Sequence, residues 1–305
     1  MVNSPLLKNI AIIGGGSIGQ EYSRILSAHS VSHRIISRSS SIDEDLLIRQ
    51  DVRDIPIDEL NGFDGFIIAV QAGYNFEITK FILANTSTPV LVEKPLSLVQ
   101  SDHLGLHDQF ERIFIALNRR KFESVKALRN ASEPRVRKSA LAEVTELESR
   151  ISGPDDVVAA WPIANTLHII DMALYGANTY HYLDEGLVIE KGEGLIRGRV
   201  STRDDTHEVL FLDFHKLTGN WGIEIASSEG RHILRPLETL QFQERDTFKR
   251  VSVDLPEDKF KPGFESNVVD FVAQNRSAFI SFKEYDFLME LIAKLYDLNE
   301  ASAAS

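Results

Sequence analysis

Residues 9–19 read Asn-Ile-Ala-Ile-Ile-Gly-Gly-Gly-Ser-Ile-Gly, an apolar run followed by closely spaced glycines. The apolar run is typical of a strand that is buried on both faces. Glycines follow at Gly14, Gly16 and Gly19, and apolar residues at helical spacing from 17 to 29 then predict a helix. We therefore expect a strand, a tight glycine turn and a helix in immediate succession.

The three glycines fit the pattern G-x-G-x-x-G, which carries meaning in this strand–turn–helix context. Gly14 permits the tight turn, Gly16 lets a pyrophosphate approach the backbone, and Gly19 lets the helix pack closely on the strand. The pyrophosphate then meets free amides at the helix N-terminus. The stretch predicts a dinucleotide-binding site, and the alternative is a glycine-rich turn without a ligand.

The first third of the chain is predicted to alternate strands and helices. Strands are predicted at 33–37, 66–70, 90–92 and 113–117, and helices at 43–50, 75–84 and 97–110. Such repetition predicts right-handed crossovers and a parallel sheet that helices cover on both faces. Residues 1–117 are therefore expected to form a Rossmann-type domain with a doubly wound parallel sheet.

The pattern changes after residue 117. A helix is predicted over 120–130, and long alternating segments between 187 and 253 predict a large, mainly antiparallel open sheet. Two helices are predicted near the end of the chain, at 264–277 and 283–299. The chain is thus expected to be an α/β protein with a second α/β domain at 118–305.

The composition excludes several classes of function. The chain has 305 residues, a formal charge of −12 and no cysteine. The missing cysteines exclude disulfides, thiolate metal sites and cysteine nucleophiles. The negative charge disfavours nucleic acid and anionic membranes as partners. No apolar stretch approaches the ~20 residues of a membrane span, and no signal peptide is recognisable, so we expect a cytoplasmic protein.

No metal site is predicted. His103 and His107 are spaced as neighbours on one helix face, but no further histidine or acidic residue completes a ligand pattern. A solvated helix face is expected there instead.

The end of the second predicted strand indicates which nucleotide is bound. NAD sites usually place an acidic residue there, about 20 residues past the glycines, to hold the ribose 2′-hydroxyl. Here the chain has Ser37 and Arg38, and the first acid is Asp43, in the next element. A guanidinium beside hydroxyls suits a 2′-phosphate, so NADP is favoured over NAD. The alternative is an Arg38 that stacks on the adenine of NAD.

A second motif, Glu93-Lys94-Pro95, follows the predicted strand at 90–92. Proline disfavours the helical region for Lys94, so the chain leaves the strand extended. This aims Lys94 from the carboxyl edge of the sheet into the ligand crevice. Beside a nicotinamide cation its pKa would fall, and its amine would hydrogen-bond a reacting hydroxyl or carbonyl. The alternative is a surface lysine after a strand.

The order of the motifs resembles the Gfo/Idh/MocA family of NAD(P)-dependent oxidoreductases. The glycine pattern, Glu93-Lys94-Pro95, Asn118-Arg119-Arg120 and His168-Ile-Ile-Asp171 follow one another as in that family, and the resemblance covers essentially the whole chain. It implies hydride transfer between the nicotinamide and a hydroxyl-bearing carbon of a sugar, cyclitol or nucleotide-linked sugar. It also implies that the second domain binds substrate and builds a homodimer or homotetramer through its sheet.

By this resemblance Lys94 is the catalytic lysine and His168 a general acid/base or orienting group. Histidine is also, independently, the side chain best suited to proton transfer near neutral pH. Substrate contacts are predicted for Lys94, Trp161, Asn165, His168 and Asp171. For Asp171 the alternative is bracing of its helix, and for Trp161 it is a core anchor. For His168 the alternative is a core histidine, and for Arg119 it is a surface basic run. Cofactor contacts are predicted for Gly14, Gly16, Ser17, Ile18, Gly19, Ser37, Arg38, Val70, Gln71, Asn75, Glu93, Lys94 and Arg119.

The sequence departs from the family at the proton relay. Members carry an aspartate four residues before the histidine, where this chain has Ala164, with Asn165 beside it. Either His168 with Lys94 suffices, or Asn165 substitutes as a hydrogen-bonding catalytic group, or the protein is a poor catalyst. The alternative function is a non-catalytic NAD(P)-binding sensor or regulatory protein of the same fold.

Overall fold

The computed structural model describes residues 6–38, 45–131, 138–145, 153–180, 188–192, 195–201, 207–214, 221–228, 230–244, 247–251 and 259–298. The chain folds as two compact units. The first comprises Met1–Asn118 with Asp258–Asp286, and the second comprises Arg119–Glu257 with Phe287–Ser305. Asp43, named above as the first acid after Arg38, lies outside the described residues.

Sheet A of the first unit is parallel throughout. Its strands are β1 (Asn9–Ile13), β2 (Ser32–Ile36), β3 (Leu47–Ile48), β4 (Gly65–Ile68), β5 (Val90–Glu93) and β6 (Ile113–Ala116). The strand order β3-β2-β1-β4-β5-β6 confirms the predicted Rossmann-type sheet. Strand addition reverses between β1 and β4, and such sheets bind ligands at this point, beyond the carboxyl ends of the strands.

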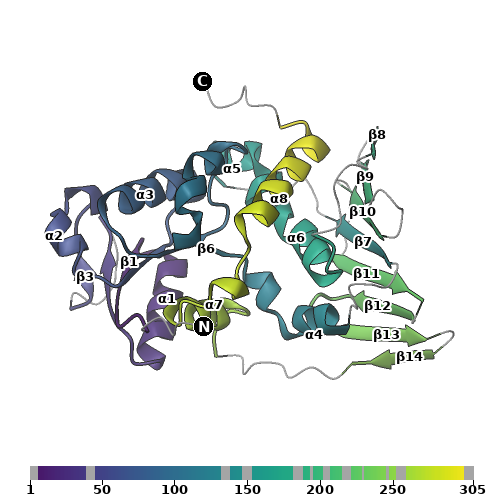
Figure 1. Ribbon diagram of the computed structural model, residues 1–305, viewed down its shortest axis with the longest axis horizontal. Coiled ribbons are helices and arrows are strands. Elements are labelled where there is room, and N and C mark those ends of the chain that lie inside the picture. Colours follow the sequence, from purple (N-terminus) through teal and green to yellow (C-terminus); the bar gives the residue numbers. More distant parts are fainter. Residues whose placement is uncertain are drawn as a thin grey trace. The chain divides into compact units, whose positions relative to one another are not determined.

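Helices cover both faces of sheet A. The first unit contains α1 (Ser17–Ala28), α2 (Ile57–Leu60), α3 (Ala72–Asn85), α7 (Phe264–Val272) and the 3₁₀ segments η1 (Val52–Asp54), η2 (Asp102–Arg112) and η6 (Arg276–Ala278). Helix α1 packs on β1, β2 and α7, whereas α3 packs on β4, β5 and η2. Figure 1 shows α1 with α7 on one side of the sheet and α3 on the other.

The hydrophobic core of the first unit includes residues of α7, a helix far along the chain from sheet A. Ile10, Ile12 and Tyr22 pack in one cluster with Phe264 and Phe271, all buried. The aromatic face of α7 therefore fills sheet A's own core, although the sequence pattern placed this helix with the second domain. Burying such side chains contributes roughly 1.5–3 kcal/mol each.

Two local expectations were wrong. Residues 47–48 pair with β2 as strand β3 where a helix was predicted, because Leu47 and Ile48 extend the apolar sheet edge. Segment η2 is a 3₁₀ helix, and His103 is 1% exposed rather than solvated. Its Nδ1 lies 2.8 Å from the carbonyl of Gln100 and its Nε2 lies 2.9 Å from Asp286 Oδ1, so the surroundings are polar despite the burial.

Sheet B of the second unit is mainly antiparallel, as predicted; β7 and β10 form its parallel pair. Its order is β14-β13-β12-β11-β7-β10-β9-β8. The strands are β7 (Lys138–Thr145), β8 (Val188–Gly192), β9 (Leu195–Ser201), β10 (His207–Phe214), β11 (Gly222–Ser227), β12 (Gly230–Leu234), β13 (Leu240–Glu244) and β14 (Thr247–Arg250). The large open sheet of the prediction is confirmed.

The helical segments of the second unit in the described residues are η3 (Asn118–Lys121), whose first residue belongs to the first unit, α4 (Glu123–Ala131), α5 (Asp155–Ala159), η5 (Pro162–Thr166) and α6 (Leu167–Gly176). Helix α8 (Phe282–Tyr296) contributes its start to the first unit and the remainder to the second. A capping box begins α8: Ser281 N donates to Glu284 Oε2 at 2.9 Å, and Glu284 N donates to Ser281 Oγ at 3.2 Å.

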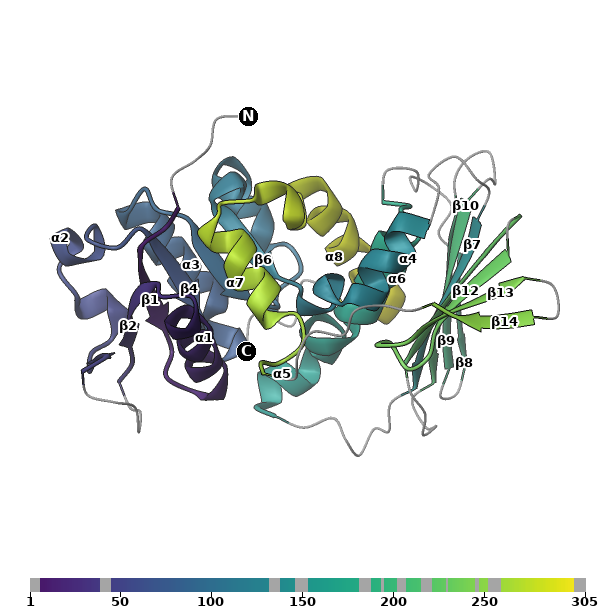
Figure 2. The ribbon, with the colours of Figure 1, turned by 90° about the horizontal axis from the view of Figure 1, so that it is seen from below.

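Helices α4 and α6 cover one face of sheet B (Figure 2). Val209, Ile223 and Ile225 point to that face and are buried, whereas the alternating residues Leu210 and Glu224 are half-buried on the opposite face. Within the described ranges, no helix has both the length and the apolar character that crossing a membrane requires.

Candidate cofactor and catalytic site

The glycine turn has the geometry that the motif predicts. Gly14 has φ of +109°, and a Cβ on it would overlap the carbonyl oxygen of Ala69. A Cβ on Gly19 would overlap the carbonyl oxygen of Gly14, so α1 packs against β1 more closely than a side chain allows. A Cβ on Gly16 would meet nothing within 4 Å. Gly14 and Gly19 are thus required by packing, whereas Gly16 borders open space.

The N-terminus of α1 suits an anion. The helix begins at Ser17 after Gly16, no side chain caps it, and its first turn holds no acidic residue. Gly16 and Ser17 are exposed and Ile18 is half-buried. Its first-turn amides and the positive end of the helix dipole therefore face the side where a pyrophosphate would lie. The residues present fit a dinucleotide.

The carboxyl edge of sheet A gathers the other predicted cofactor residues of the first unit. Because the strands are parallel, the residues that follow β1, β2, β4 and β5 share one edge. Ser37 and Arg38 follow β2, and Lys94 follows β5. Val70 lies beside the glycine turn, its Cγ1 being 3.2 Å from the Cβ position of Gly14, and Gln71 precedes α3 and is exposed.

Arg38 lies in a charged cluster that the sequence did not reveal. Its side chain is 75% exposed, and its Nε is 3.9 Å from Asp51 Oδ2. Arg53 holds the same carboxylate in a fork, with Nε 2.9 Å from Oδ1 and Nη2 2.8 Å from Oδ2. These hydrogen bonds from Arg53 hold the pKa of Asp51 well below its usual range. Two guanidinium groups therefore flank one ionised carboxylate beside the end of β2.

Asn75 supports the backbone on both sides of Lys94. It is 1% exposed, and its Nδ2 donates to the carbonyls of Glu93 at 2.9 Å and Pro95 at 2.8 Å. Both amide protons are thereby used on backbone on either side of Lys94. These contacts make Asn75 a support for the turn, whereas the sequence placed it at the cofactor.

Glu93 is also turned inward. It is 8% exposed and accepts a hydrogen bond from the hydroxyl of Tyr22, which is wholly buried in α1. Burial raises the pKa of Glu93 above its ordinary value, and hydrogen bonds from Tyr22 and Asn118 and the charge of Lys94 offset only part of that rise. Burial likewise raises the pKa of Tyr22. The side chain of Lys94 is half-buried.

The remaining predicted residues belong to the second unit, so their meeting with Lys94 stays a prediction. Asn165 lies in η5, a π-helical turn, and His168 lies in the first turn of α6. Single π turns are rare and occur frequently at functional sites. His168 is 5% exposed, whereas Asn165 and Trp161 are half-buried. Trp161, Asn165 and His168 therefore lie within one helical stretch, residues 161–176.

Asp171 is enclosed by its own unit. Arg120 Nε lies 2.9 Å from Oδ1 and 2.8 Å from Oδ2 of Asp171, and the hydroxyl of Tyr180 donates to Oδ1 at 2.6 Å. Asp171 is 1% exposed. These contacts favour bracing of α6 over a direct contact with substrate.

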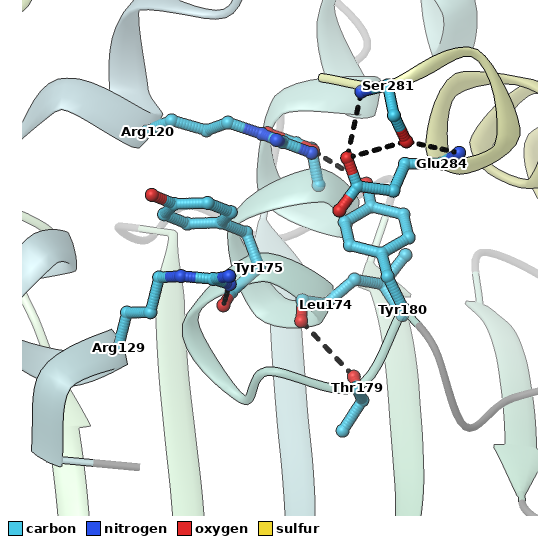
Figure 3. Close-up of polar contacts among 9 residues, drawn as sticks. Arg120, Arg129, Leu174, Tyr175, Thr179, Tyr180, Ser281 and Glu284 are labelled. Carbon is cyan, nitrogen blue, oxygen red and sulfur yellow. Dashed lines mark hydrogen bonds and ion pairs between the residues drawn. The ribbon is translucent and has the colours of Figure 1, made fainter. Parts of the chain in front are cut away.

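Arginines also order the aromatic side chains around α6. Figure 3 shows the ring of Tyr175 between the guanidinium groups of Arg120 and Arg129, whose Cζ atoms are 4.6 and 4.1 Å from the ring centroid. Arg119, a predicted cofactor contact, stacks on Trp221, with its Cζ 4.2 Å from the ring centroid. No group of three or more histidine, aspartate or glutamate side chains in the described residues is placed to hold a metal ion.

No family model and no curated protein sequence matches this chain. Solved structures match nearly all of it. UDP-N-acetylglucosamine 3-dehydrogenase GnnA from Acidithiobacillus ferrooxidans has 14% identity and a TM-score of 0.72, with 96% of this chain and 98% of that chain covered. Levoglucosan dehydrogenase, solved with NADH and levoglucosan, has 15% identity and a TM-score of 0.72 over 95% and 96% of the two chains. A Gfo/Idh/MocA family oxidoreductase from Vibrio cholerae has 16% identity and a TM-score of 0.69 over 95% and 97%.

At these identities the likeness shows the fold. This chain has the fold of the Gfo/Idh/MocA-type dehydrogenases, which confirms the fold that the resemblance implied.

Proposed function

We propose that the protein is an NAD(P)-dependent oxidoreductase acting on a hydroxyl-bearing carbon of a sugar, cyclitol or nucleotide-linked sugar. The observation that carries the proposal is the pairing of two features at one edge of sheet A. Gly16 borders open space at the N-terminus of α1, and Lys94 follows β5 at the same carboxyl edge of the sheet. The fold neighbours include a nucleotide-sugar dehydrogenase and a dehydrogenase solved with NADH and a sugar derivative, which supports this substrate class.

Each residue has a defined part in the proposed chemistry. The bound nicotinamide would accept or supply the hydride. Lys94 hydrogen-bonds the substrate oxygen and stabilises negative charge that develops on it. His168 holds or releases the proton, and Asn165 orients the same oxygen by hydrogen bonding. Trp161 offers an aromatic face for a sugar ring.

The test is Lys94→Ala, assayed by nicotinamide absorbance against a panel of sugars, cyclitols and nucleotide sugars. Turnover should fall at least ~10²-fold, as expected for the loss of one acid/base group, while cofactor binding is retained. Lys80→Ala, on the exposed side of α3, is the matched control and should keep wild-type turnover. Full activity in Lys94→Ala would refute the assigned mechanism.

The sensor alternative differs in one observable. A sensor or regulatory protein of this fold would bind NAD(P) and a sugar-like ligand without any absorbance change in the panel. Ala164, in place of the family's aspartate, is the feature that favours it.

We propose NADP as the preferred cofactor, with NAD as the alternative. Arg38 and Arg53 together supply two guanidinium groups against one carboxylate at the end of β2, which favours a dianionic 2′-phosphate. The expected result for Arg38→Ala is a loss of NADPH affinity of about tenfold or more, with NADH affinity little changed, because a charge-assisted hydrogen bond contributes about 1.5–3 kcal/mol. Arg34→Ala, an exposed arginine within β2, is the control in the same titration. Equal losses for both cofactors would assign Arg38 to the adenine.

We also propose a homodimer or homotetramer built through the open face of sheet B. Half-buried Leu141, Leu210 and Ile233 lie on this face. Arg–Glu pairs flank them, at 3.1 Å for Arg199 and Glu208 and at 3.0 Å for Arg231 and Glu224. An apolar centre with a paired, charged surround suits a self-complementary interface.

The cytoplasm is the location that accords with a chain without cysteine.

A further inference from the structure

Three side chains form one stripe along α6. His168, Asp171 and Tyr175 follow one another at i, i+3 and i+7, the spacing that places residues on a single helix face. His168 and Asp171 are 5% and 1% exposed, and Tyr175 is half-buried. His168 stands at the N-terminal end of the stripe, and it handles the proton in the chemistry proposed above. The other two members are both held by one residue from outside the helix.

That residue is Arg120, in η3. Its guanidinium donates to both carboxylate oxygens of Asp171, with Nε 2.9 Å from Oδ1 and 2.8 Å from Oδ2, and Nη2 2.5 Å from Oδ1. Its Cζ also lies 4.6 Å from the ring centroid of Tyr175 and 5.3 Å from that of Tyr180 (Figure 3). The hydroxyl of Tyr180 completes the cluster by donating to Asp171 at 2.6 Å. One guanidinium therefore contacts α6 at two positions of the stripe.

Stability alone does not explain why this site holds charges. The side chains of Arg120 and Asp171 are 4% and 1% exposed. Burying two charges costs free energy that their attraction must offset, and well-packed apolar side chains of similar volume often stabilise a protein as well or better. The best-attested use of a buried polar pair is to fix one register between packed elements. A planar guanidinium that bonds to both oxygens of a carboxylate has this directionality, whereas apolar packing specifies position less sharply.

We propose that the Arg120–Asp171 pair fixes the rotation of α6 and thereby aims the imidazole of His168, so that Arg120 is a positioning residue for proton transfer and Tyr180 supports it. The inference rests on the proposed function, which assigns the proton to His168. The coupling runs through the helix itself, because Asp171 lies one turn beyond His168, about 4.5 Å along the axis at 1.5 Å per residue. On its other side, the first turn of α6 adjoins the π turn η5, which departs from α-helical hydrogen bonding.

The test replaces both charges together, so that neither is left without its partner. In the double variant Arg120→Met with Asp171→Leu, apolar side chains fill the site, and the melting temperature should stay within about 5 °C of wild type. The imidazole signal of His168 is compared between the two full-length proteins by ¹H–¹³C NMR at one pH without substrate, and His168→Gln assigns it. The signal should shift or split in the double variant, because α6 is no longer confined to one register. An unchanged signal would overturn the proposal.

Two controls accompany this comparison. Ser124→Ala removes another buried hydrogen bond of the second unit, from Ser124 Oγ to the carbonyl of Leu237 at 2.6 Å, and should leave the His168 signal in place. The buried His33 of the first unit, whose Nε2 lies 2.7 Å from Ser23 Oγ, is the internal reference in the same spectra, and its signal should not move. A shift of equal size in Ser124→Ala would show that any loss of packing moves His168, which contradicts a specific role of Arg120.

Two single variants keep the proposal testable if the double variant does not fold. Arg120→Lys retains the positive charge but cannot form the planar fork, so the His168 signal should move. Tyr180→Phe removes one donor to Asp171 and should move the signal less. If neither variant moves it, the proposal is overturned in the same way.

In an active enzyme the positioning role also has a kinetic signature. The double variant should lower kcat about tenfold or more, because a proton-transfer group displaced by about 1 Å loses much of its effect. The KM for the sugar and the Kd for NADPH should stay within about twofold of wild type, since the pair touches neither ligand in the proposed chemistry. A loss confined to KM would assign the pair to substrate binding and overturn the positioning role.

The outcomes separate this inference from the proposed function. If the His168 signal moves as expected but the wild type turns over no sugar, the oxidoreductase proposal fails and the orientation of His168 by Arg120 stands. If the wild type is active and the double variant keeps both its His168 signal and its kcat, the positioning role fails and the proposed function stands.

Discussion

Asp171 and Arg120 give a residue-scale prediction about stability. Their side chains are 1% and 4% exposed, so removing Arg120 takes a close opposite charge away from a buried carboxylate. Arg120→Ala should lower the free energy of unfolding by about 3–5 kcal/mol, measured by urea denaturation. The exposed pair of Lys126 and Glu123 is the comparison, and Glu123→Gln should cost about 0–1 kcal/mol. Similar losses for the two variants would contradict the structural role of the buried pair.

The candidate site was only partly predictable from its residues. The motif predicts that Lys94 follows a strand. It does not predict that the side chain of Glu93 is buried, because the burial of every residue of β5 depends on the folded sheet. Tyr22 shares the helical spacing of Ile18, Ile25 and Leu26, so the pattern alone assigns it to the apolar face of the helix. A buried tyrosine usually needs a partner for its hydroxyl, and this was the available signal. The sequence does not predict a role for Arg53, because that role depends on its hydrogen bonds to Asp51 in the folded protein.

At the scale of elements, the turn from β1 to α1 allows packing and cofactor binding to be tested at two different glycines, Gly19 and Gly16. Gly19→Ala should destabilise the protein, because its Cβ would overlap the carbonyl oxygen of Gly14. Gly16→Ala should leave the melting temperature close to wild type, since its Cβ meets nothing within 4 Å, yet it should weaken cofactor binding at least about tenfold. Thermal melts and a cofactor titration check both. Normal cofactor affinity in Gly16→Ala would argue against the pyrophosphate position.

Elements were predictable where one signal dominated. Strands β1, β4, β5 and β6 are buried on both faces, so continuous apolar runs predict them, whereas alternation predicts the strands of sheet B. Strand β3 was missed because two residues carry no periodicity. Segment η2 has helical spacing in sequence, and local hydrogen bonding decides that it is 3₁₀. Helix α7 was found, but its partner depends on tertiary packing that no local pattern records.

At the scale of the whole molecule, assembly through sheet B can be tested directly. Leu210→Glu places a charge in the half-buried centre of the open face and should shift the sedimentation coefficient toward that of the monomer. Lys126→Glu, on α4 at the helix-covered side, should leave the assembly unchanged. If the wild type already sediments as a monomer, the proposed interface is wrong.

The return of residues 258–286 to the first unit has a consequence for synthesis on the ribosome. Domains generally begin to fold N-terminal first as the chain emerges. Here the nascent Rossmann unit lacks Phe264, Val268 and Phe271 until most of the chain has been translated. The apolar side chains that these residues cover therefore stay exposed until residue 271 has left the ribosome, and a fragment ending near residue 118 should be captured by chaperones or aggregate.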